Sequence, residues 1–153
     1  LMIKNNEPYL IEYNVRMGDP ECQVILPRLK TDLLKIIIFS IQNKLKKIKI
    51  NWIKEKSMTI VLCSKGYPGR YKKNIIIKKL NSLKENRKDF IYHAGTKIIN
   101  RQILSIGGRV LNFTSLGKDL LKVRKKIIKN IKKLNWKSGF FRKDIGWKIL
   151  NKR

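Results

Sequence analysis

The sequence predicts an α+β fold, and three observations lead to that prediction. Several short segments rich in β-branched residues are bounded by glycine and proline turn signals, as strands are. Two further segments have the apolar pattern and the start signals of helices. Strands and helices do not alternate regularly, which argues against a parallel sheet built from βαβ units. At 153 residues, the chain is long enough to bury one sizeable core.

The N-terminal part predicts one strand and one helix. An apolar run predicts a strand over about 8–14, which leads through Gly18-Asp19-Pro20 into a short helical turn. Thr31-Asp32 offers an N-cap for a helix that runs to about Asn43. The apolar residues of this helix lie almost all round, so we expect it to be buried between layers. Residues 44–56 are interpreted as a linker that runs into a strand.

The remainder of the chain predicts most of the strands and a second helix. The helix begins at Lys118-Asp119 and runs to about Leu134, because apolar residues recur there at helical spacing. Its other face carries six lysines, which we interpret as a solvated basic surface. Residues 72–87 are expected to mix strand and loop. The strands are expected over Ser57–Cys63, Phe90–Ile98, Gln102–Leu104 and Arg109–Ser115.

Three polar residues near the N-terminus form a candidate phosphate and metal site. Glu12, Asn14 and Arg16 are spaced two residues apart, so on a strand all three side chains would share one face. A carboxylate, an amide oxygen and a guanidinium suit a hard divalent cation and the phosphate that it carries. The alternative is an amphipathic strand whose polar face is merely solvated.

The formal net charge of +27 suggests a nucleic-acid ligand, but the distribution of charge does not. The 28 lysines outnumber the nine arginines and are spread along the chain, and alanine occurs once, as in proteins of AT-rich genomes. We therefore expect no specific nucleic-acid partner, only weak and salt-sensitive adhesion to polyanions. A free-standing basic module that binds RNA or anionic surfaces remains the alternative function.

Other composition signals are weaker. No run of about 18 uncharged apolar residues occurs, so we expect no membrane partner. Cys22 and Cys63 are too few and too far apart to indicate a zinc site or a disulfide scaffold, which fits a reducing cytoplasm. Cys63 is expected to be a small buried residue. His93, the only histidine, is expected to be structural.

Five motifs, in order, give the chain a family resemblance. The segment from Glu12 to Asp32, with Gly-Asp-Pro-Glu after Arg16, closely resembles the phosphoribosylamine–glycine ligases, which are ATP-grasp enzymes of purine synthesis. The resemblance covers nearly the whole chain, but only the C-terminal third of such an enzyme, so we expect a fragment that is inactive alone. The later motifs are Ser64–Gly69, His93–Lys97, Gly107–Leu111 and Arg142–Gly146.

This resemblance implies two domains. Residues 1–44 would be the C-terminal remnant of an ATP-grasp domain. Residues 45–153 would form a small, mostly antiparallel β domain with a packed helix. The full-length enzyme is expected to be a cytoplasmic monomer.

The resemblance also implies a reaction and roles in it. Glycine is activated by ATP as glycyl phosphate, which the amine of 5-phosphoribosylamine then attacks. Glu12 and Asn14 would hold Mg²⁺ or Mn²⁺. Arg16 would be catalytic, because its permanent charge stabilises the transferring phosphoryl group or the acyl phosphate.

Four residues are implied in substrate binding. The spacing of Gly107-Gly108-Arg109 alone favours a β-turn with an exposed arginine, whereas the resemblance favours a site for the ribose 5-phosphate. Arg109, beside Gly108, is the first choice for this contact and Lys97 the second. Asp19 would bind the glycine ammonium group or cap the following helical turn. Gly66-Tyr67-Pro68-Gly69 is interpreted as a structural turn, and Lys65 stands where the family usually has glycine.

Overall fold

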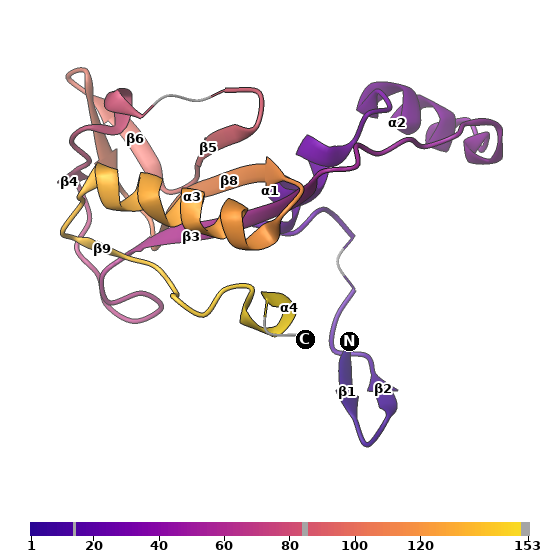
Figure 1. Cartoon of the computed structure of the whole chain (residues 1–153), viewed down its shortest axis with the longest axis horizontal. Coiled ribbons are helices and arrows are strands. Elements are labelled where there is room, and N and C mark those ends of the chain that lie inside the picture. The colour runs from indigo at the N-terminus through magenta and orange to yellow at the C-terminus, as the bar shows by residue number, and fades with distance from the viewer. Residues whose placement is uncertain (14, 84–85, 151–153) are drawn as a thin grey trace.

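A four-stranded antiparallel sheet lies at the centre of the molecule. The computed structural model describes residues 1–13, 15–83 and 86–150. The sheet has the order β5-β8-β3-β9, and its two long central strands pair from Lys56↔Gly117 to Cys63↔Arg109 (Figure 1). The predictions for both long strands are confirmed. The bounds are β3 Lys56–Ser64, β5 Asp89–His93, β8 Arg109–Gly117 and β9 Gly139–Phe140.

The helix α3, Leu120–Leu134, packs against β3 and β8 and closes the core. Asp119 caps it by accepting hydrogen bonds from the backbone N–H groups of Leu121 (2.8 Å) and Lys122 (3.2 Å). Asn135 ends it in the left-handed region, at φ 49°. The predicted helix is therefore confirmed. To the core cluster it contributes Val123, Ile127, Ile131 and Leu134, and the two strands contribute Met58, Ile60, Leu62, Val110, Leu111 and Phe113.

A smaller antiparallel sheet has the order β4-β7-β6. Its strands are β4 Ile75–Ile76, β6 Thr96–Ile99 and β7 Gln102–Ser105, and the 3₁₀ turn η3 spans Leu80–Ser82. The single strand predicted over Phe90–Ile98 is wrong. The chain leaves the central sheet after His93 and enters the smaller sheet at Thr96. Gly95 crosses so near Gly107 that a Cβ atom on Gly95 would lie 2.5 Å from the Gly107 Cα.

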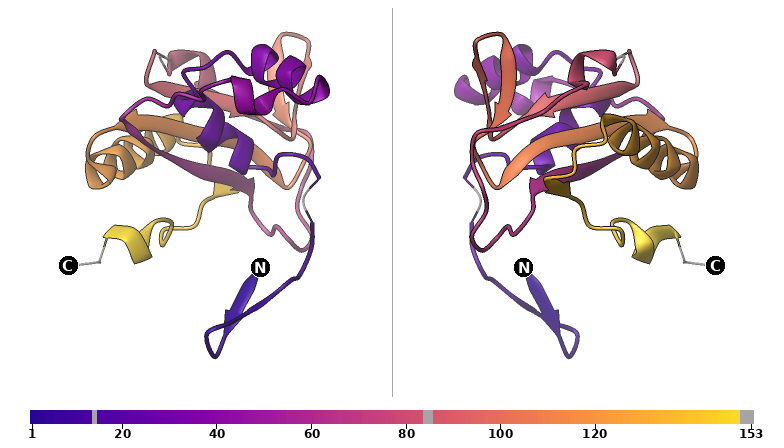
Figure 2. Two further views of the ribbon diagram at one scale, coloured as in Figure 1. Left: turned by 90° about the vertical axis from the view of Figure 1, so that its right-hand side faces the viewer. Right: turned by 90° about the vertical axis from the view of Figure 1, so that its left-hand side faces the viewer.

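The first strands form a hairpin that stands away from both sheets (Figures 1 and 2). β1, Met2–Lys4, pairs with β2, Glu7–Tyr9, and all six residues are exposed. The strand predicted over about 8–14 is therefore wrong in extent. Tyr9 already pairs with Met2, so β1 offers no residue to pair with the segment after Leu10.

Four short helical elements connect this hairpin to β3. They are α1 Glu21–Ile25, η1 Leu26–Arg28, α2 Leu33–Ile41 and η2 Leu45–Lys47. Both α1 and η1 contact β3, and the short turn predicted after Gly18-Asp19-Pro20 is confirmed. In α2 the predicted cap is also confirmed, because Asp32 accepts a hydrogen bond from the Lys35 N–H (2.9 Å).

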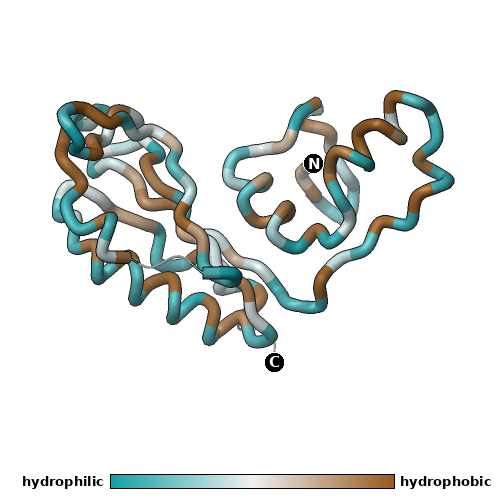
Figure 3. The backbone as a smooth tube through the Cα atoms, turned by 90° about the horizontal axis from the view of Figure 1, so that it is seen from above, coloured by the Kyte–Doolittle hydropathy of each residue, from teal (hydrophilic) through white to brown (hydrophobic). Residues whose placement is uncertain are grey.

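The prediction that α2 is buried between layers is wrong. None of its residues is buried, and Leu34 and Ile41 are 64% and 77% exposed. In Figure 3 the helix appears as a hydrophobic segment well apart from the sheets. The apolar pattern shows that the side chains of this helix favour burial, but it does not determine whether another part of the protein packs against them. No helix in the described ranges is long and apolar enough to cross a membrane.

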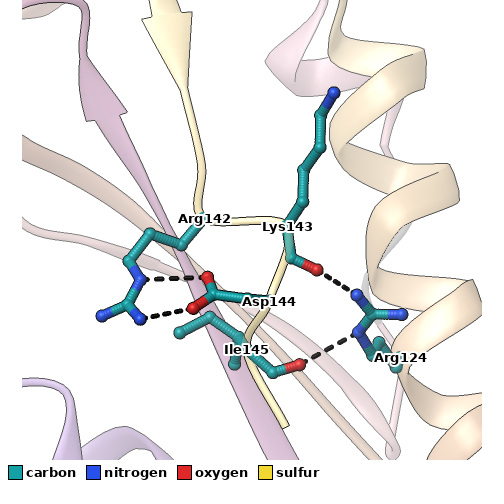
Figure 4. Close-up of polar contacts among 5 residues, drawn as sticks. All are labelled: Arg124, Arg142, Lys143, Asp144 and Ile145. Atoms are coloured by element: carbon teal, nitrogen blue, oxygen red, sulfur yellow. Dashed lines mark hydrogen bonds and ion pairs between the residues drawn. The ribbon is translucent and has the colours of Figure 1, made fainter. Parts of the chain in front are cut away.

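The C-terminal motif Arg142–Gly146 fastens the last segment to α3 (Figure 4). The Arg124 guanidinium, from α3, donates hydrogen bonds to the carbonyl oxygens of Lys143 and Ile145. Arg142 forms a two-pronged ion pair with Asp144, at 3.1 and 2.6 Å. The short helix α4, Trp147–Leu150, follows. These contacts give the motif a structural role.

Candidate functional site

Two residues that the sequence nominated for substrate binding lie together. Arg109 Nη1 donates a hydrogen bond to the backbone carbonyl oxygen of Asp19 (2.8 Å), and Arg109 Nε lies 3.4 Å from Asp19 Oδ2. Gln23 Nε2 donates to the other carboxylate oxygen, Asp19 Oδ1, at 2.8 Å. The arginine and aspartate side chains remain 43% and 39% exposed. Solvent therefore reaches a guanidinium that also contacts a residue 90 positions away in the sequence.

These contacts argue against the alternative that the Asp19 side chain caps helix α1. The N-cap of α1 is Pro20, and the described residues give this helix no side-chain cap. The Asp19 side chain instead accepts from Gln23 within the turn and faces Arg109 across it. Sequence reasoning missed Gln23, although its position four residues after Asp19, at the start of a helical turn, was a usable signal.

Besides the motif that carries Asp19, three of the five motifs meet at the start of β8. The backbone N–H of Ser64 donates to the Gly108 carbonyl oxygen (2.7 Å), and its hydroxyl donates to the Gly107 carbonyl oxygen (2.8 Å). The N–H of Gly95 donates to the carbonyl oxygen of Arg109 (2.9 Å). The backbone that carries Arg109 is thus held by both of the other motifs.

The glycines here permit close packing. A Cβ atom on Gly108 would lie 2.0 Å from Cδ2 of Tyr67, so the ring of Tyr67 rests directly on the Gly108 backbone. Gly66 has φ +103° and lies in the tight turn before Tyr67. This geometry agrees with a structural role for the Gly66–Gly69 turn. Gly108 itself is buried.

Lys97 lies in the other sheet. It is an exposed residue of β6, paired with Leu104 of β7. Within the described residues, no hydrogen bond or ion pair joins it to Asp19 or Arg109. Its neighbourhood is organised by His93, whose Nδ1 lies 2.8 Å from the Thr96 hydroxyl oxygen. This contact agrees with a structural role for the histidine.

Two of the three proposed metal and phosphate residues, Glu12 and Arg16, lie outside the sheets. Glu12 is exposed beyond the end of β2, and the exposed Arg16 donates through Nη1 to the carbonyl oxygen of Met17 (3.2 Å). Asn14 lies outside the described residues. Because β2 ends at Tyr9, the structure does not bring Glu12 and Arg16 to one strand face. In the part of the chain that is described, no group of three or more His, Cys, Asp or Glu residues could hold a metal ion.

Cys63 lies beside the Asp19–Arg109 pair, opposite Arg109 in the β3–β8 register. Burial raises the pKa of its thiol; the positive charge of Arg109 opposes this rise, and the negative charge of Asp19 adds to it. The thiol therefore stays protonated near neutral pH. Cys63 acts as a small buried residue, as expected.

The fold and the order of these motifs define the C domain of one class of purine enzyme. The family described as "Phosphoribosylglycinamide synthetase, C domain" matches residues 57–148, and the chain belongs to this family.

Relatives carry a more particular name. The chain is 41% identical over 152 residues to "Phosphoribosylamine--glycine ligase, chloroplastic" of Arabidopsis thaliana, covering 98% of this chain and 29% of the relative. It is 43% identical over 150 residues to phosphoribosylamine–glycine ligase of Agrobacterium fabrum, covering 98% of this chain and 35% of the relative. It thus spans about a third of the length of these relatives.

A solved structure agrees with the fold. The crystal structure of phosphoribosylamine–glycine ligase from Thermotoga maritima matches with a TM-score of 0.69 and 26% identity. The match covers 94% of this chain and 34% of that one. The predicted α+β class, with antiparallel strands and a packed helix, is confirmed. The family assignment does not favour the alternative of an RNA-binding module.

Proposed function

We propose that this chain is the C-terminal part of a ligase that joins glycine to 5-phosphoribosylamine at the expense of ATP, in purine synthesis. The observation that carries the proposal is the contact between Asp19 and Arg109, which unites two motifs shared with the ligases in one exposed polar site. The relatives' names supply the reaction. Since the chain spans about a third of their length, it would contribute part of an active site.

Arg109 would bind the 5-phosphate of phosphoribosylamine. A guanidinium presents paired N–H donors that match two phosphate oxygens, and this one is fixed at its backbone and still solvent-accessible. Asp19 would orient the guanidinium from one side, in addition to or instead of binding the glycine ammonium group. Gly108 would supply the tight backbone beside it. Lys97, in the neighbouring sheet, is the second candidate for the phosphate.

The N-terminal segment would serve the phosphoryl transfer. The Glu12 carboxylate and the Asn14 amide are oxygen donors of the kind that Mg²⁺ or Mn²⁺ takes, and such an ion neutralises charge on the phosphates of ATP. Arg16 would stabilise the transferring phosphoryl group or glycyl phosphate. In the same proposal, residues 1–44 complete an ATP-grasp domain and residues 45–153 form the C-terminal domain.

The experiment is a chimaera in which this chain replaces the segment that it matches in the Agrobacterium fabrum relative. Arg109→Ala should raise the KM for phosphoribosylamine by about 10- to 100-fold, because a charge-assisted contact of roughly 1.5–3 kcal/mol is lost. The KM values for glycine and ATP should change little. Arg109→Lys should restore only part of the loss, since a point charge lacks the paired donors.

The matched control is Arg87→Ala, which removes the same charge from an exposed turn before β5. It should leave all three KM values unchanged. Equal damage to all three substrates by Arg109→Ala would show that Arg109 merely holds the turn together. Normal kinetics would return Arg109 to the role of an exposed arginine.

A further inference from the structure

A basic pocket of about 510 Å³ lies next to the turn that carries Tyr67. Two segments form it: the loop that follows β3 and the turn between α3 and β9. Four of the residues that line it are cationic, and none of the described lining residues is acidic. The lining residues are Lys65, Arg70, Tyr71, Lys72, Lys137 and Ser138.

Backbone contacts hold this pocket in shape. The Lys65 N–H donates to the Ser138 carbonyl oxygen (2.8 Å), which joins the two segments. Gly66, at φ +103°, folds the loop so tightly that a Cβ atom there would lie 2.2 Å from the Arg70 carbonyl oxygen. The backbone at Lys65 and Arg70 is therefore positioned by contacts that do not involve the side chains of these two residues.

An aromatic contact connects the pocket to the central sheet. The ring of Tyr71 meets that of Tyr67 edge to face, with centroids 6.2 Å apart, and Tyr67 rests on Gly108 of the turn before β8. One wall of the pocket is thus anchored to the sheet. The pocket nevertheless shares no lining residue with the Asp19–Arg109 pair.

The charges around this pocket point to a compact, multiply charged anion. Four exposed cationic residues line one hollow, so the local potential is positive, and a bound anion would reduce the repulsion among their charges. Arg and Lys are the usual ligands of phosphate oxygens, and Tyr71 and Ser138 add hydroxyl groups that can donate hydrogen bonds. The volume is in the range of small-molecule sites, about 300–1,000 Å³.

We propose that this pocket binds an oligophosphate, either free or as the phosphate tail of a nucleotide. The proposal does not depend on the ligase activity proposed above, because the described lining of the pocket includes neither Asp19 nor Arg109. The expected ligand carries several negative charges and presents paired phosphate oxygens to the cationic residues.

Titration calorimetry on the full chain in about 150 mM KCl tests the proposal, with inorganic pyrophosphate, inorganic tripolyphosphate and ATP as probes. Pyrophosphate and tripolyphosphate should bind with a Kd below about 1 mM. Lys65→Ser combined with Arg70→Ser should weaken binding by at least about 10-fold. The loop should persist, because the contacts that shape it are made by backbone atoms.

The control is Arg87→Ser combined with Lys118→Ser, which removes the same charge from the other end of the sheet. Lys118 follows Gly117, which pairs with Lys56, whereas the pocket follows Ser64 at the far end of β3. The control should change the Kd by less than about 2-fold.

The three probes separate the two sources of phosphate. ATP that binds at least about 10-fold more tightly than tripolyphosphate would identify a nucleotide tail as the ligand, and equal or weaker binding would identify a free oligophosphate. Absence of binding by every probe would overturn the proposal. Equal weakening by the two pairs of substitutions would overturn it as well, because it would show that binding follows the diffuse charge of the chain.

Discussion

Replacing Gly108 with alanine tests whether the packing of Tyr67 supports the backbone beside Arg109. The new Cβ atom would lie 2.0 Å from Tyr67 Cδ2 and 2.5 Å from Cε2, whereas carbon atoms normally approach to about 3.5–4.0 Å. The Tyr67 ring must therefore move by more than about 1 Å. Overpacking of this kind costs about 1–3 kcal/mol of unfolding free energy.

Urea and thermal unfolding, followed by tryptophan fluorescence, measure this cost. For a chain of this size, each kcal/mol lowers Tm by about 2–4 °C, so Gly108→Ala should lower Tm by about 2–12 °C. The control is Gly69→Ala in the same loop. There the nearest atom to the new Cβ is the Gly66 carbonyl oxygen, at 3.2 Å, so the loss should be much smaller.

A double-mutant cycle identifies the cause. In a Tyr67→Ala background the ring is absent, so adding Gly108→Ala should cost less than about 0.5 kcal/mol. If Gly108→Ala costs the same in both backgrounds, the penalty arises in the backbone. The account of the Tyr67 turn as a support for Arg109 would then fail.

Three further predictions concern stability and association. Asp119→Ala should lower the free energy of unfolding in urea by about 0.5–2 kcal/mol, because it uncaps a helix that closes the core, whereas Asp32→Ala, which uncaps the exposed α2, should change it much less. Burial by itself raises the pKa of Asp89, but hydrogen bonds led by that from Lys126 outweigh it and hold the pKa below its usual value. The stability this carboxylate contributes is therefore present above its unfolded pKa of about 3.9 and is lost as pH falls through the lower folded pKa. Asp89→Asn should lower the free energy of unfolding by about 1–3 kcal/mol at pH 7 and should make it less dependent on pH below about pH 4. If urea unfolding shows the same loss of stability at low pH in the variant as in the original chain, the prediction is wrong. Leu34→Lys, on the apolar surface of α2, should leave Tm unchanged and reduce self-association in light scattering.

The long central strands and α3 were predictable from sequence because their signals are local. The segment Ser57–Cys63 contains a run of β-branched residues and is bounded by turns. The apolar residues of α3 recur at helical spacing after the Asp119 cap. The break at Gly95 was not predictable, because the cause is Gly107, a residue twelve positions away that approaches in space. The exposure of α2 was missed for a related reason, since periodicity describes a helix and not its neighbours.

The sequence likewise predicted the individual residues of the candidate site but not the contact between them. The motifs nominated Asp19 and Arg109 separately, and each had a local alternative, a helical cap and an exposed turn. Their contact depends on how the α1 turn packs on β3 and β8, so no pattern within either motif contains it. The roles of Glu12, Asn14 and Arg16 stay a prediction.

The Asp19–Arg109 contact can orient the arginine without closing it to a ligand. The pair is about two-fifths exposed, and exposed ion pairs contribute only about 0–1 kcal/mol because water and salt screen them. A phosphate that accepts two hydrogen bonds from the same guanidinium gains about 1.5–3 kcal/mol, so it competes with the carboxylate at 3.4 Å, although not with the 2.8 Å hydrogen bond from Arg109 Nη1 to the Asp19 carbonyl oxygen. The backbone contacts from Ser64 and Gly95 do not involve the guanidinium and would persist when a ligand binds. In the proposed function, a phosphate would therefore displace the Asp19 carboxylate from the Arg109 guanidinium while the backbone of Arg109 stays in place.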